Sequence, residues 1–220
     1  MNEKLPVSFN REIILELYQR LMNAYGPQNW WPADSDFEVM VGAVLTQNTA
    51  WKNVERAIAN LKHENKLRIE EIIKLPDTAL AELIRPSGYF NVKTRRLKNL
   101  CHWVQSVGGI DKLYEMGTIE FRDSLLAVNG VGPETADDIL LYAFNRPVFV
   151  IDTYTRRLLS SLGLVNGDET YESLQNKFEA CLDSDYQVFN EYHALIVRHA
   201  KQKCNRTGEC DHCLVERPFN

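Results

Sequence analysis

The stretch LLAVNGVGPETA at residues 125–136, followed by PVFVID at residues 147–152, decides how this chain folds. Gly130 and Gly132 permit positive φ angles and leave backbone N–H groups uncovered, and Pro133 suits the first turn of a helix. The stretch therefore predicts a hairpin between two helices. Such a turn can hold a phosphate oxygen, but most short glycine turns only join two helices, and the glycines alone do not separate these roles.

A single carboxylate ends the second part of this stretch. Residues 147–151 have the composition of a strand, yet no other segment offers a strand partner, so we expect an extended and buried connector. The connector leads to Asp152, directly before a helix that carries Arg156 and Arg157. An aspartate at this place is either the N-cap of that helix or a functional carboxylate, and one residue can serve both purposes.

Apolar residues recur at helical spacing along most of the remaining chain. Residues 37–45 are apolar almost all round, which predicts a helix at the centre of a core, capped by Ser35 or Asp36. We expect an essentially all-α protein with helices at residues 11–25, 37–45, 50–62, 69–74, 78–84, 93–107, 111–114, 119–128, 133–144, 153–162, 171–182 and 188–200.

Composition limits the class of protein. With 220 residues and 45% hydrophobic content, the chain can bury the core of one large domain or two small ones. It contains no apolar run of membrane-spanning length and no secretory signal pattern, so we expect a cytoplasmic protein without membrane contact. The net charge of −5 disfavours indiscriminate nucleic-acid binding, although two basic clusters offer local positive faces: Lys93, Arg95, Arg96 and Lys98, and Arg198, His199, Lys201 and Lys203.

Four short motifs occur in an order that resembles one known family. They are LTQNT at residues 45–49, GYFNVK at residues 88–93, GVGPETA at residues 130–136 and VIDT at residues 150–153. Together they resemble the helix-hairpin-helix DNA glycosylases, the HhH-GPD superfamily of endonuclease III, over roughly residues 37–200. The resemblance implies two helical domains with the active site in a cleft between them: a helical barrel of residues 28–146 that includes the hairpin, and residues 1–27 together with 147–220.

The resemblance also implies how the chemistry is done. Asp152 would stabilise the cationic sugar as the base leaves, and would orient or deprotonate a water molecule. Members of the family that also cleave the strand use a lysine just before the position of Thr135, where this chain has Glu134. A carboxylate cannot form an imine, so we expect a monofunctional enzyme that uses water. Glu134 also suits the positive end of the helix dipole.

The bases removed are expected to be alkylated purines of the 3-methyladenine type. The basis is a combined resemblance to the 3-methyladenine DNA glycosylase III branch, carried by QNT at residues 47–49 with Trp51, by the pair Trp30 and Trp31, and by glutamate at the lysine position. Such bases are electron-poor and often cationic, and they stack well on indole rings. The expected base pocket contains Trp30, Trp31, Trp51 and Glu134. The alternative for each tryptophan is that it only fills the core.

The expected partner is double-stranded DNA that contains a damaged base, bound by a monomeric protein that is nucleoid-associated while it acts. Gln47 would fill the gap left by the flipped nucleotide, or would instead be a buried amide that ties a helix end to nearby backbone. The loop at residues 88–91 would wedge the other strand. The full expected DNA-binding set is Gln47, Asn91, Lys93, Gly130, Val131, Gly132 and Arg157.

The C-terminal cysteines resemble the start of the iron–sulfur site found in many family members. Cys204, Cys210 and Cys213 are present, but Phe219 stands near the expected place of the fourth cysteine. We expect a degenerate or labile [4Fe-4S] site and no cofactor needed for the chemistry. A zinc site completed by His212 is the alternative, although its spacing is cramped.

Two other functions compete with removal of alkylated bases. One is an endonuclease III-like glycosylase and lyase for oxidised pyrimidines, or a mismatch uracil/thymine glycosylase. The other belongs to a different class, a non-catalytic module that binds DNA lesions. Retention of Asp152 favours an enzyme over the binding module.

Overall fold

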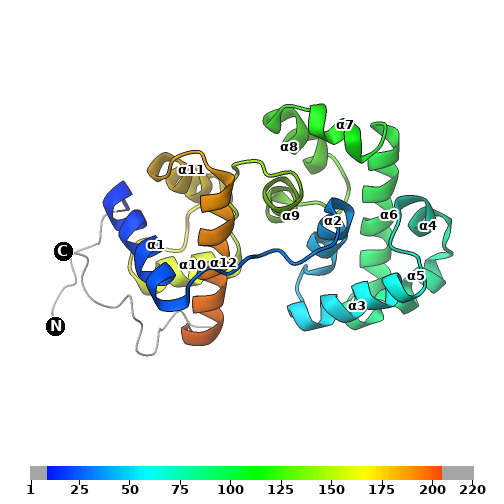
Figure 1. The fold of residues 1–220 in the computed structure, drawn as a ribbon, viewed down its shortest axis with the longest axis horizontal. Coiled ribbons are helices and arrows are strands. Elements are labelled where there is room, and N and C mark those ends of the chain that lie inside the picture. The colour runs from blue at the N-terminus through cyan, green and yellow to red at the C-terminus, as the bar shows by residue number, and fades with distance from the viewer. Residues whose placement is uncertain (1–8, 205–220) are drawn as a thin grey trace. The chain divides into compact units, whose positions relative to one another are not determined.

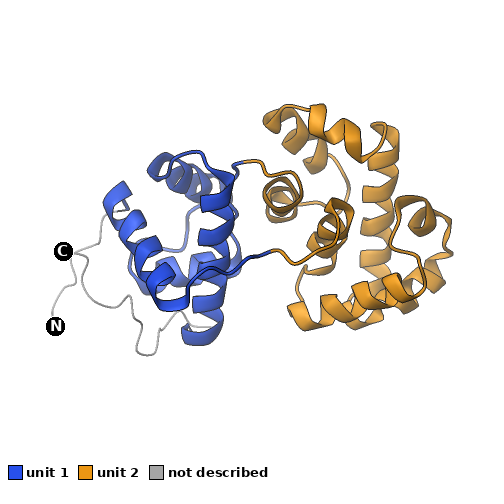
Figure 2. Ribbon diagram, in the orientation of Figure 1, with its two compact units in different colours: residues 1–30, 147–220 blue, residues 31–146 orange. Residues whose placement is uncertain are grey.

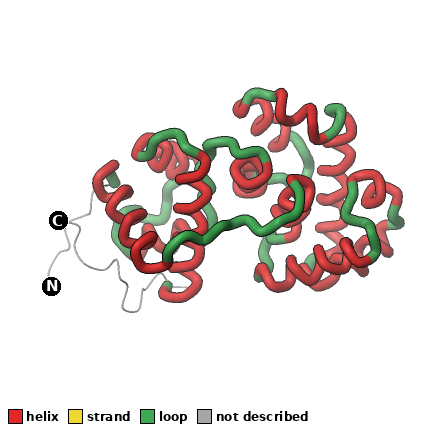
Figure 3. The backbone as a smooth tube through the Cα atoms, viewed as in Figure 1, coloured by secondary structure: helices red, strands yellow, loops and turns green. Residues whose placement is uncertain are grey.

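The computed structural model describes residues 9–204, and every regular element in that range is a helix (Figures 1 and 3). The all-α fold predicted from the sequence is therefore confirmed. No helix in the same range combines the length and the hydrophobicity that crossing a bilayer requires.

The chain divides into two compact units (Figure 2). Unit 1 consists of residues 1–30 and 147–220, and unit 2 consists of residues 31–146. These limits lie close to the domain limits at residues 28 and 146 that the resemblance implies.

Unit 1 is built around its last helix. Its helices are α1 (Arg11–Tyr25), α10 (Thr153–Ser161), α11 (Tyr171–Cys181) and α12 (Tyr186–Lys203). Both α1 and α10 pack against α12. In the core, the buried Tyr192 hydroxyl donates to the Ile14 carbonyl at 2.8 Å, which joins α12 to α1.

The connector before α10 is extended and buried, as predicted. Because it has no strand neighbour, side chains of α11 satisfy its backbone. The Phe149 N–H donates to Glu179 at 2.9 Å, and the Gln175 side-chain amide donates to the Phe149 carbonyl at 2.8 Å. The Phe149 ring stacks on Phe178 with centroids 4.2 Å apart. The connector is thus a fixed part of the unit 1 core.

Unit 2 surrounds a helix that is buried on nearly all sides. Its elements are α2 (Asp36–Leu45), α3 (Trp51–His63), α4 (Ile69–Lys74), α5 (Asp77–Ile84), η1 (Arg85–Ser87), α6 (Phe90–Ser106), α7 (Ile110–Glu115), α8 (Thr118–Leu126), α9 (Pro133–Asp138) and η2 (Ile139–Ala143). The central helix α2 contacts α3, α6, α9 and η2. Its predicted cap is present, because the Ser35 hydroxyl accepts from the Glu38 N–H at 3.2 Å.

Most predicted helix boundaries differ from the structure by one to three residues, and two of the differences have a local structural cause. The helix predicted at residues 133–144 is α-helical only to Asp138 and then forms the π-type turn η2. All five η2 residues are buried, so the segment has no amphipathic period that could reveal the change of pitch. Helix α6 begins at Phe90 instead of residue 93. Its N-cap is Tyr89, which adopts a left-handed φ of 45°.

Candidate active site

Asp152 lies where the connector of unit 1 meets helix α10. Its side chain is the N-cap of that helix, and Oδ1 accepts a hydrogen bond from the Thr155 N–H at 2.7 Å. The residue is only 9% exposed. The N-cap role expected from the sequence is therefore present, and it leaves Oδ2 free of this bond.

Oδ2 has a second neighbour, which no sequence motif indicates. His193, on α12, places its Nε2 atom 3.7 Å from Oδ2, which is an ion-pair distance and not a hydrogen-bond distance. Burial by itself raises the pKa of Asp152. His193 and the Thr155 N–H lower the pKa by more than burial raises it, so the pKa lies below its ordinary value. The carboxyl group is thus held in its charged form.

Aromatic rings lie beside His193 within unit 1. Trp30 is parallel to the His193 ring, with an interplanar angle of 3° and centroids 6.0 Å apart. The Lys201 ammonium lies over Trp30 and over Tyr154, at 5.8 and 5.2 Å from the ring centroids. The Asp152 site therefore combines a buried anion with aromatic faces that already attract a cation.

The other two predicted pocket tryptophans belong to unit 2. Trp31 meets Trp51 edge to face at 4.9 Å and Tyr142 at 5.2 Å. The Trp31 ring also covers Gly42 on α2, where an added Cβ would lie 2.9 Å from the ring. The structure brings Trp31 and Trp51 together and places Trp30 with Asp152.

The predicted hairpin joins α8 to α9 in unit 2. Its turn closes through a hydrogen bond from the Val131 N–H to the Val128 carbonyl at 3.0 Å, and Gly130 has a φ of 102°. The two arms are held by a bidentate pair, in which Arg122 donates to the fully buried Asp137 at 2.7 and 3.0 Å. Gly132 is exposed, so the turn presents part of its backbone to solvent.

Gln47, just after α2, is bound to this hairpin. Its side-chain amide donates to the Gly130 carbonyl at 3.1 Å and to the Thr135 hydroxyl at 2.9 Å, and its oxygen accepts from Arg96. The alternative role considered for Gln47, an amide that ties a helix end to nearby backbone, describes this structure. Its placement in a DNA gap stays a prediction.

The expected phosphate contact of Lys93 is corrected by the structure. Lys93 is 1% exposed, and its ammonium donates to the carbonyls of Leu45 at 2.8 Å and Ser87 at 2.7 Å. Burial lowers its pKa to about 8, with a further contribution from the charge of Arg96. Lys93 therefore caps the end of α2 from inside the core, and its ammonium is not exposed for a phosphate.

The other predicted contact residues lie at the surface or half-buried. Asn91 and Glu134 are exposed in the first turns of α6 and α9, and Arg157 on α10 is half-buried against the Tyr154 ring at 5.3 Å. Beside Asn91, the Tyr89 side chain is 71% exposed. Their contacts with DNA stay predictions.

The predicted metal ligands can be placed only in part. Cys204 is buried after the end of α12, whereas Cys210, His212 and Cys213 lie outside the described residues. Within residues 9–204, no three side chains of metal-binding type come together. The cluster site stays a prediction.

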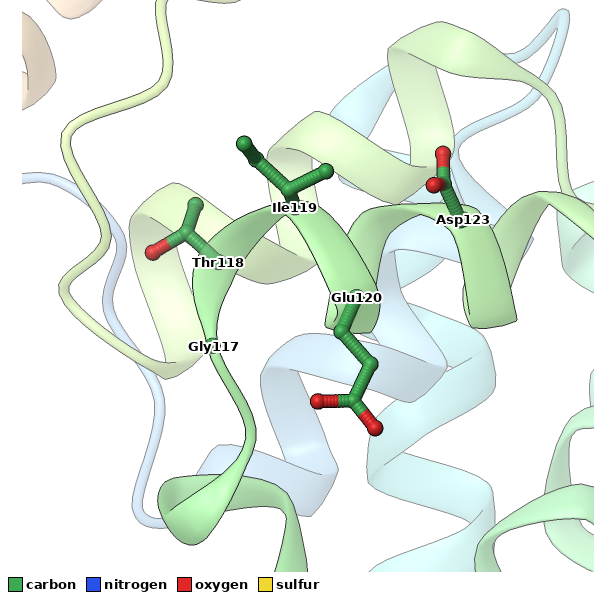
Figure 4. A pocket seen from close by; sticks show the side chains of 5 residues that line it. All are labelled: Gly117, Thr118, Ile119, Glu120 and Asp123. Carbon is green, nitrogen blue, oxygen red and sulfur yellow. The ribbon is translucent and has the colours of Figure 1, made fainter.

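A surface hollow at the start of α8 contains none of the predicted site residues (Figure 4). Its lining is Gly117, Thr118, Ile119, Glu120 and Asp123. The two carboxylates make it unsuited to backbone phosphates.

Comparison with known proteins agrees with these features. Residues 41–183 match the model of the HhH-GPD superfamily base excision DNA repair protein. A Methanocaldococcus jannaschii protein, named a putative DNA repair glycosylase, is 47% identical over 208 residues, which cover 93% of this chain and 94% of that protein.

Two solved structures share the fold. The H. pylori 3-methyladenine DNA glycosylase (MagIII), bound to 1,N6-ethenoadenine, is 30% identical, with a TM-score of 0.76 over 89% of this chain and 99% of that chain. A non-covalent endonuclease III–DNA complex has a TM-score of 0.78 at 20% identity, over 94% and 93% of the two chains. The chain therefore belongs to the HhH-GPD superfamily of base excision DNA repair proteins, and it is a DNA glycosylase.

Proposed function

We propose that this protein is a monofunctional DNA glycosylase that hydrolyses the N-glycosidic bond of alkylated bases of the 3-methyladenine type in duplex DNA. The observation that carries the proposal is the environment of Asp152, a buried carboxylate kept ionised between the Thr155 N–H and His193. A fixed negative charge of this kind stabilises a cation that develops beside it.

In the proposed reaction, the electron pair of the C1′–N bond leaves with the base while C1′ gains positive charge. Asp152 lies beside C1′ and stabilises that charge. A water oxygen then bonds to C1′, and its proton passes to Asp152 or to solvent. The products are a free base and an abasic site. Because Oδ1 is bound to the Thr155 N–H, Oδ2 is the oxygen proposed to face the sugar or the water, with His193 Nε2 3.7 Å from it.

The proposed substrate follows from the aromatic surroundings of Asp152. Alkylated purines are often cationic, and their glycosidic bond is weak, so stacking can replace most hydrogen-bond recognition. Trp30 carries an electron-rich indole ring of the kind that stacks on such a base, and the base would take the place of the Lys201 ammonium over its face. The likeness to the H. pylori 3-methyladenine DNA glycosylase at 30% identity supports the same substrate class.

DNA is the proposed partner of both units. Asp152 and Trp30 of unit 1 would meet the flipped nucleotide, while the hairpin of unit 2 would bind backbone phosphate through Gly130, Val131 and Gly132. Tyr89 and Asn91 would wedge the opposite strand. These placements follow the family pattern, and Arg157 is kept as a further phosphate contact.

The second candidate function, a glycosylase with lyase activity, has one observation in its favour. Lys201 lies near Asp152, and burial lowers its pKa, partly offset by the charge of Asp152. An amine with a lowered pKa is a better nucleophile at neutral pH. Glu134 at the family's lysine position supports the water-using enzyme instead.

The test is release of free bases from three duplexes that contain methylated purines, uracil or an oxidised pyrimidine. The proposal predicts release of 3-methyladenine and little of the other bases. Release of only uracil or oxidised pyrimidine would contradict the substrate class, and release of no base by the folded protein would favour the lesion-binding module.

A further inference from the structure

The basic cluster at the start of α6 separates into four different environments. Lys93 is buried against carbonyls, and Lys98 is bound to Asp77 and to the Leu75 carbonyl. Arg95 is exposed. Arg96 is half-buried, and its charge faces the neutral oxygen of Gln47, with no carboxylate at ion-pair distance among residues 9–204.

The stem of Arg96 lies directly on the hairpin. A Cβ added to Gly130 would fall 2.2 Å from the Arg96 Cγ atom and 2.9 Å from its Cβ atom. Side chains cannot approach this closely, so Arg96 occupies the space that a side chain at residue 130 would need. Glycine is thus required here for its positive φ and also for contact with Arg96.

Arg96 also fixes the orientation of Gln47. A carboxamide can present either its oxygen or its NH2 group to a neighbour. Because Arg96 donates to the Gln47 oxygen, the NH2 group points at the hairpin and donates to the Gly130 carbonyl and the Thr135 hydroxyl. One hydrogen-bonded chain therefore runs from Arg96 on α6 through Gln47, just after α2, to Gly130 and Thr135 of the hairpin.

A second residue on the same face of α6 also contacts the hairpin. One turn after Arg96, the Asn99 side chain donates to the Asn129 carbonyl at 3.0 Å. A guanidinium has five N–H donors, and the bond to Gln47 uses one of them. Arg96 thus brings an uncompensated positive charge with spare donors to a turn that is the expected phosphate site.

We propose that Arg96 is a DNA-backbone contact and the positioning residue of the hairpin. Its guanidinium binds the phosphate beside Gly130, and its bond to Gln47 holds the turn in the shape that receives the phosphate. This proposal rests on the family assignment and not on which base the enzyme removes.

The test measures binding to a duplex with an uncleavable abasic-site analogue at several salt concentrations. Arg96→Met is compared with Arg95→Met, which removes an equal charge one residue away. For Arg96→Met we expect the affinity to fall about tenfold or more. The slope of the logarithm of the binding constant against the logarithm of salt concentration, the salt slope, should become smaller in magnitude by about 0.9, the value for one lost phosphate contact. Arg95→Met should change affinity by less than about threefold with an unchanged slope. Equal losses in both variants, or an unchanged slope for Arg96→Met, would overturn the phosphate contact.

Two further variants test the positioning role. Arg96→Lys keeps the charge but not the planar fork, so it should restore most of the salt slope while kcat for base release stays lowered. The effects of Arg96→Met and Gln47→Ala on kcat should be strongly non-additive, because each breaks the same chain. Additive effects would overturn the positioning role. If Arg96→Met does not fold, Arg96→Lys alone tests the positioning role. A wild-type kcat for Arg96→Lys would then overturn that role.

Discussion

The Asp152 site of unit 1 acts through a buried charge, whereas the hairpin site of unit 2 acts through neutral backbone groups. Asp152 is a buried charge whose ionisation depends on a histidine and a helix N-terminus. The hairpin offers neutral backbone groups whose shape depends on Gln47 and Arg96. A reaction that creates a cation needs the first kind of site, whereas DNA of any sequence can be held by the second. Changes at the Asp152 site should therefore alter the rate or its pH dependence with little effect on binding, whereas changes at the hairpin should alter DNA binding first and kcat only through the shape of the turn.

Asp152→Asn is expected to separate catalysis from DNA binding most clearly. Asparagine is as good an N-cap as aspartate, so the start of α10 should remain intact. Removal of the charge should lower base release by about 10³-fold, while binding to an abasic-analogue duplex should change little. The matched control is Asp185→Asn, which alters the half-buried N-cap of α12 and should leave the rate unchanged. Substantial base release by Asp152→Asn would remove Asp152 from the chemistry.

Gly130→Ala should damage the hairpin more than a glycine substitution elsewhere. Gly167 is the control, since its φ of 97° is close to the 102° of Gly130 but no atom lies near its missing Cβ. Both variants bear a backbone cost of about 1–3 kcal/mol. Only Gly130→Ala also displaces Arg96, so we expect a further loss of about 1–3 kcal/mol in unfolding free energy and clearly weaker DNA binding. Chemical denaturation measures the unfolding free energy, and titration with duplex DNA measures binding. Equal effects of Gly130→Ala and Gly167→Ala would refute the proposed importance of the contact between Gly130 and Arg96.

His193→Phe should change the pH dependence of the reaction. Asp152 faces His193, the Thr155 N–H and the Lys201 charge, and loss of the histidine removes one of the influences that lower its pKa. The acid limb of kcat/KM should therefore move to higher pH. A pKa held below the ordinary 3.8 contributes stability above pH 3.8 that is lost as the pH falls through the folded value, and this contribution should shrink too. An acid limb that stays in place would show that His193 only fills the core.

The smallest effect is expected at Tyr89, which combines a left-handed φ of 45° with a 71% exposed ring. Tyr89→Gly and Tyr89→Ala both remove the proposed wedge, so both should bind a lesion duplex less tightly. Only glycine also relieves the backbone, so Tyr89→Gly should be more stable than Tyr89→Ala by about 1 kcal/mol. Thermal unfolding compares them, and binding as tight as wild type would exclude the wedge.

Much of the fold could be predicted from the sequence because it depends on local patterns. Helix α1 occupies the predicted residues 11–25, since its apolar residues return at one spacing and Gly26 ends it. The hairpin was recognisable from its glycines and Pro133. The connector before Asp152 was recognisable because an apolar run without strand partners must be buried in another way.

The errors and omissions share a different cause, which is contact between distant residues. Lys93 looked like a surface charge, but it is buried by carbonyls that include one 48 residues away. His193 sits in an apolar helical pattern, where a core histidine and an active-site histidine look alike. For Gln47, the motif suggested contact with DNA, whereas the choice of partners was set by Arg96, 49 residues along the chain.

The central claim is that water, and not an amine of the protein, attacks C1′ at the Asp152 site. The most direct measurement is incubation of the enzyme with methylated duplex DNA in the presence of borohydride, which traps an imine as a stable adduct. The account predicts free 3-methyladenine, an uncut strand with an abasic site, and no protein–DNA adduct. A trapped adduct that forms in the wild type and disappears in Lys201→Gln would contradict it.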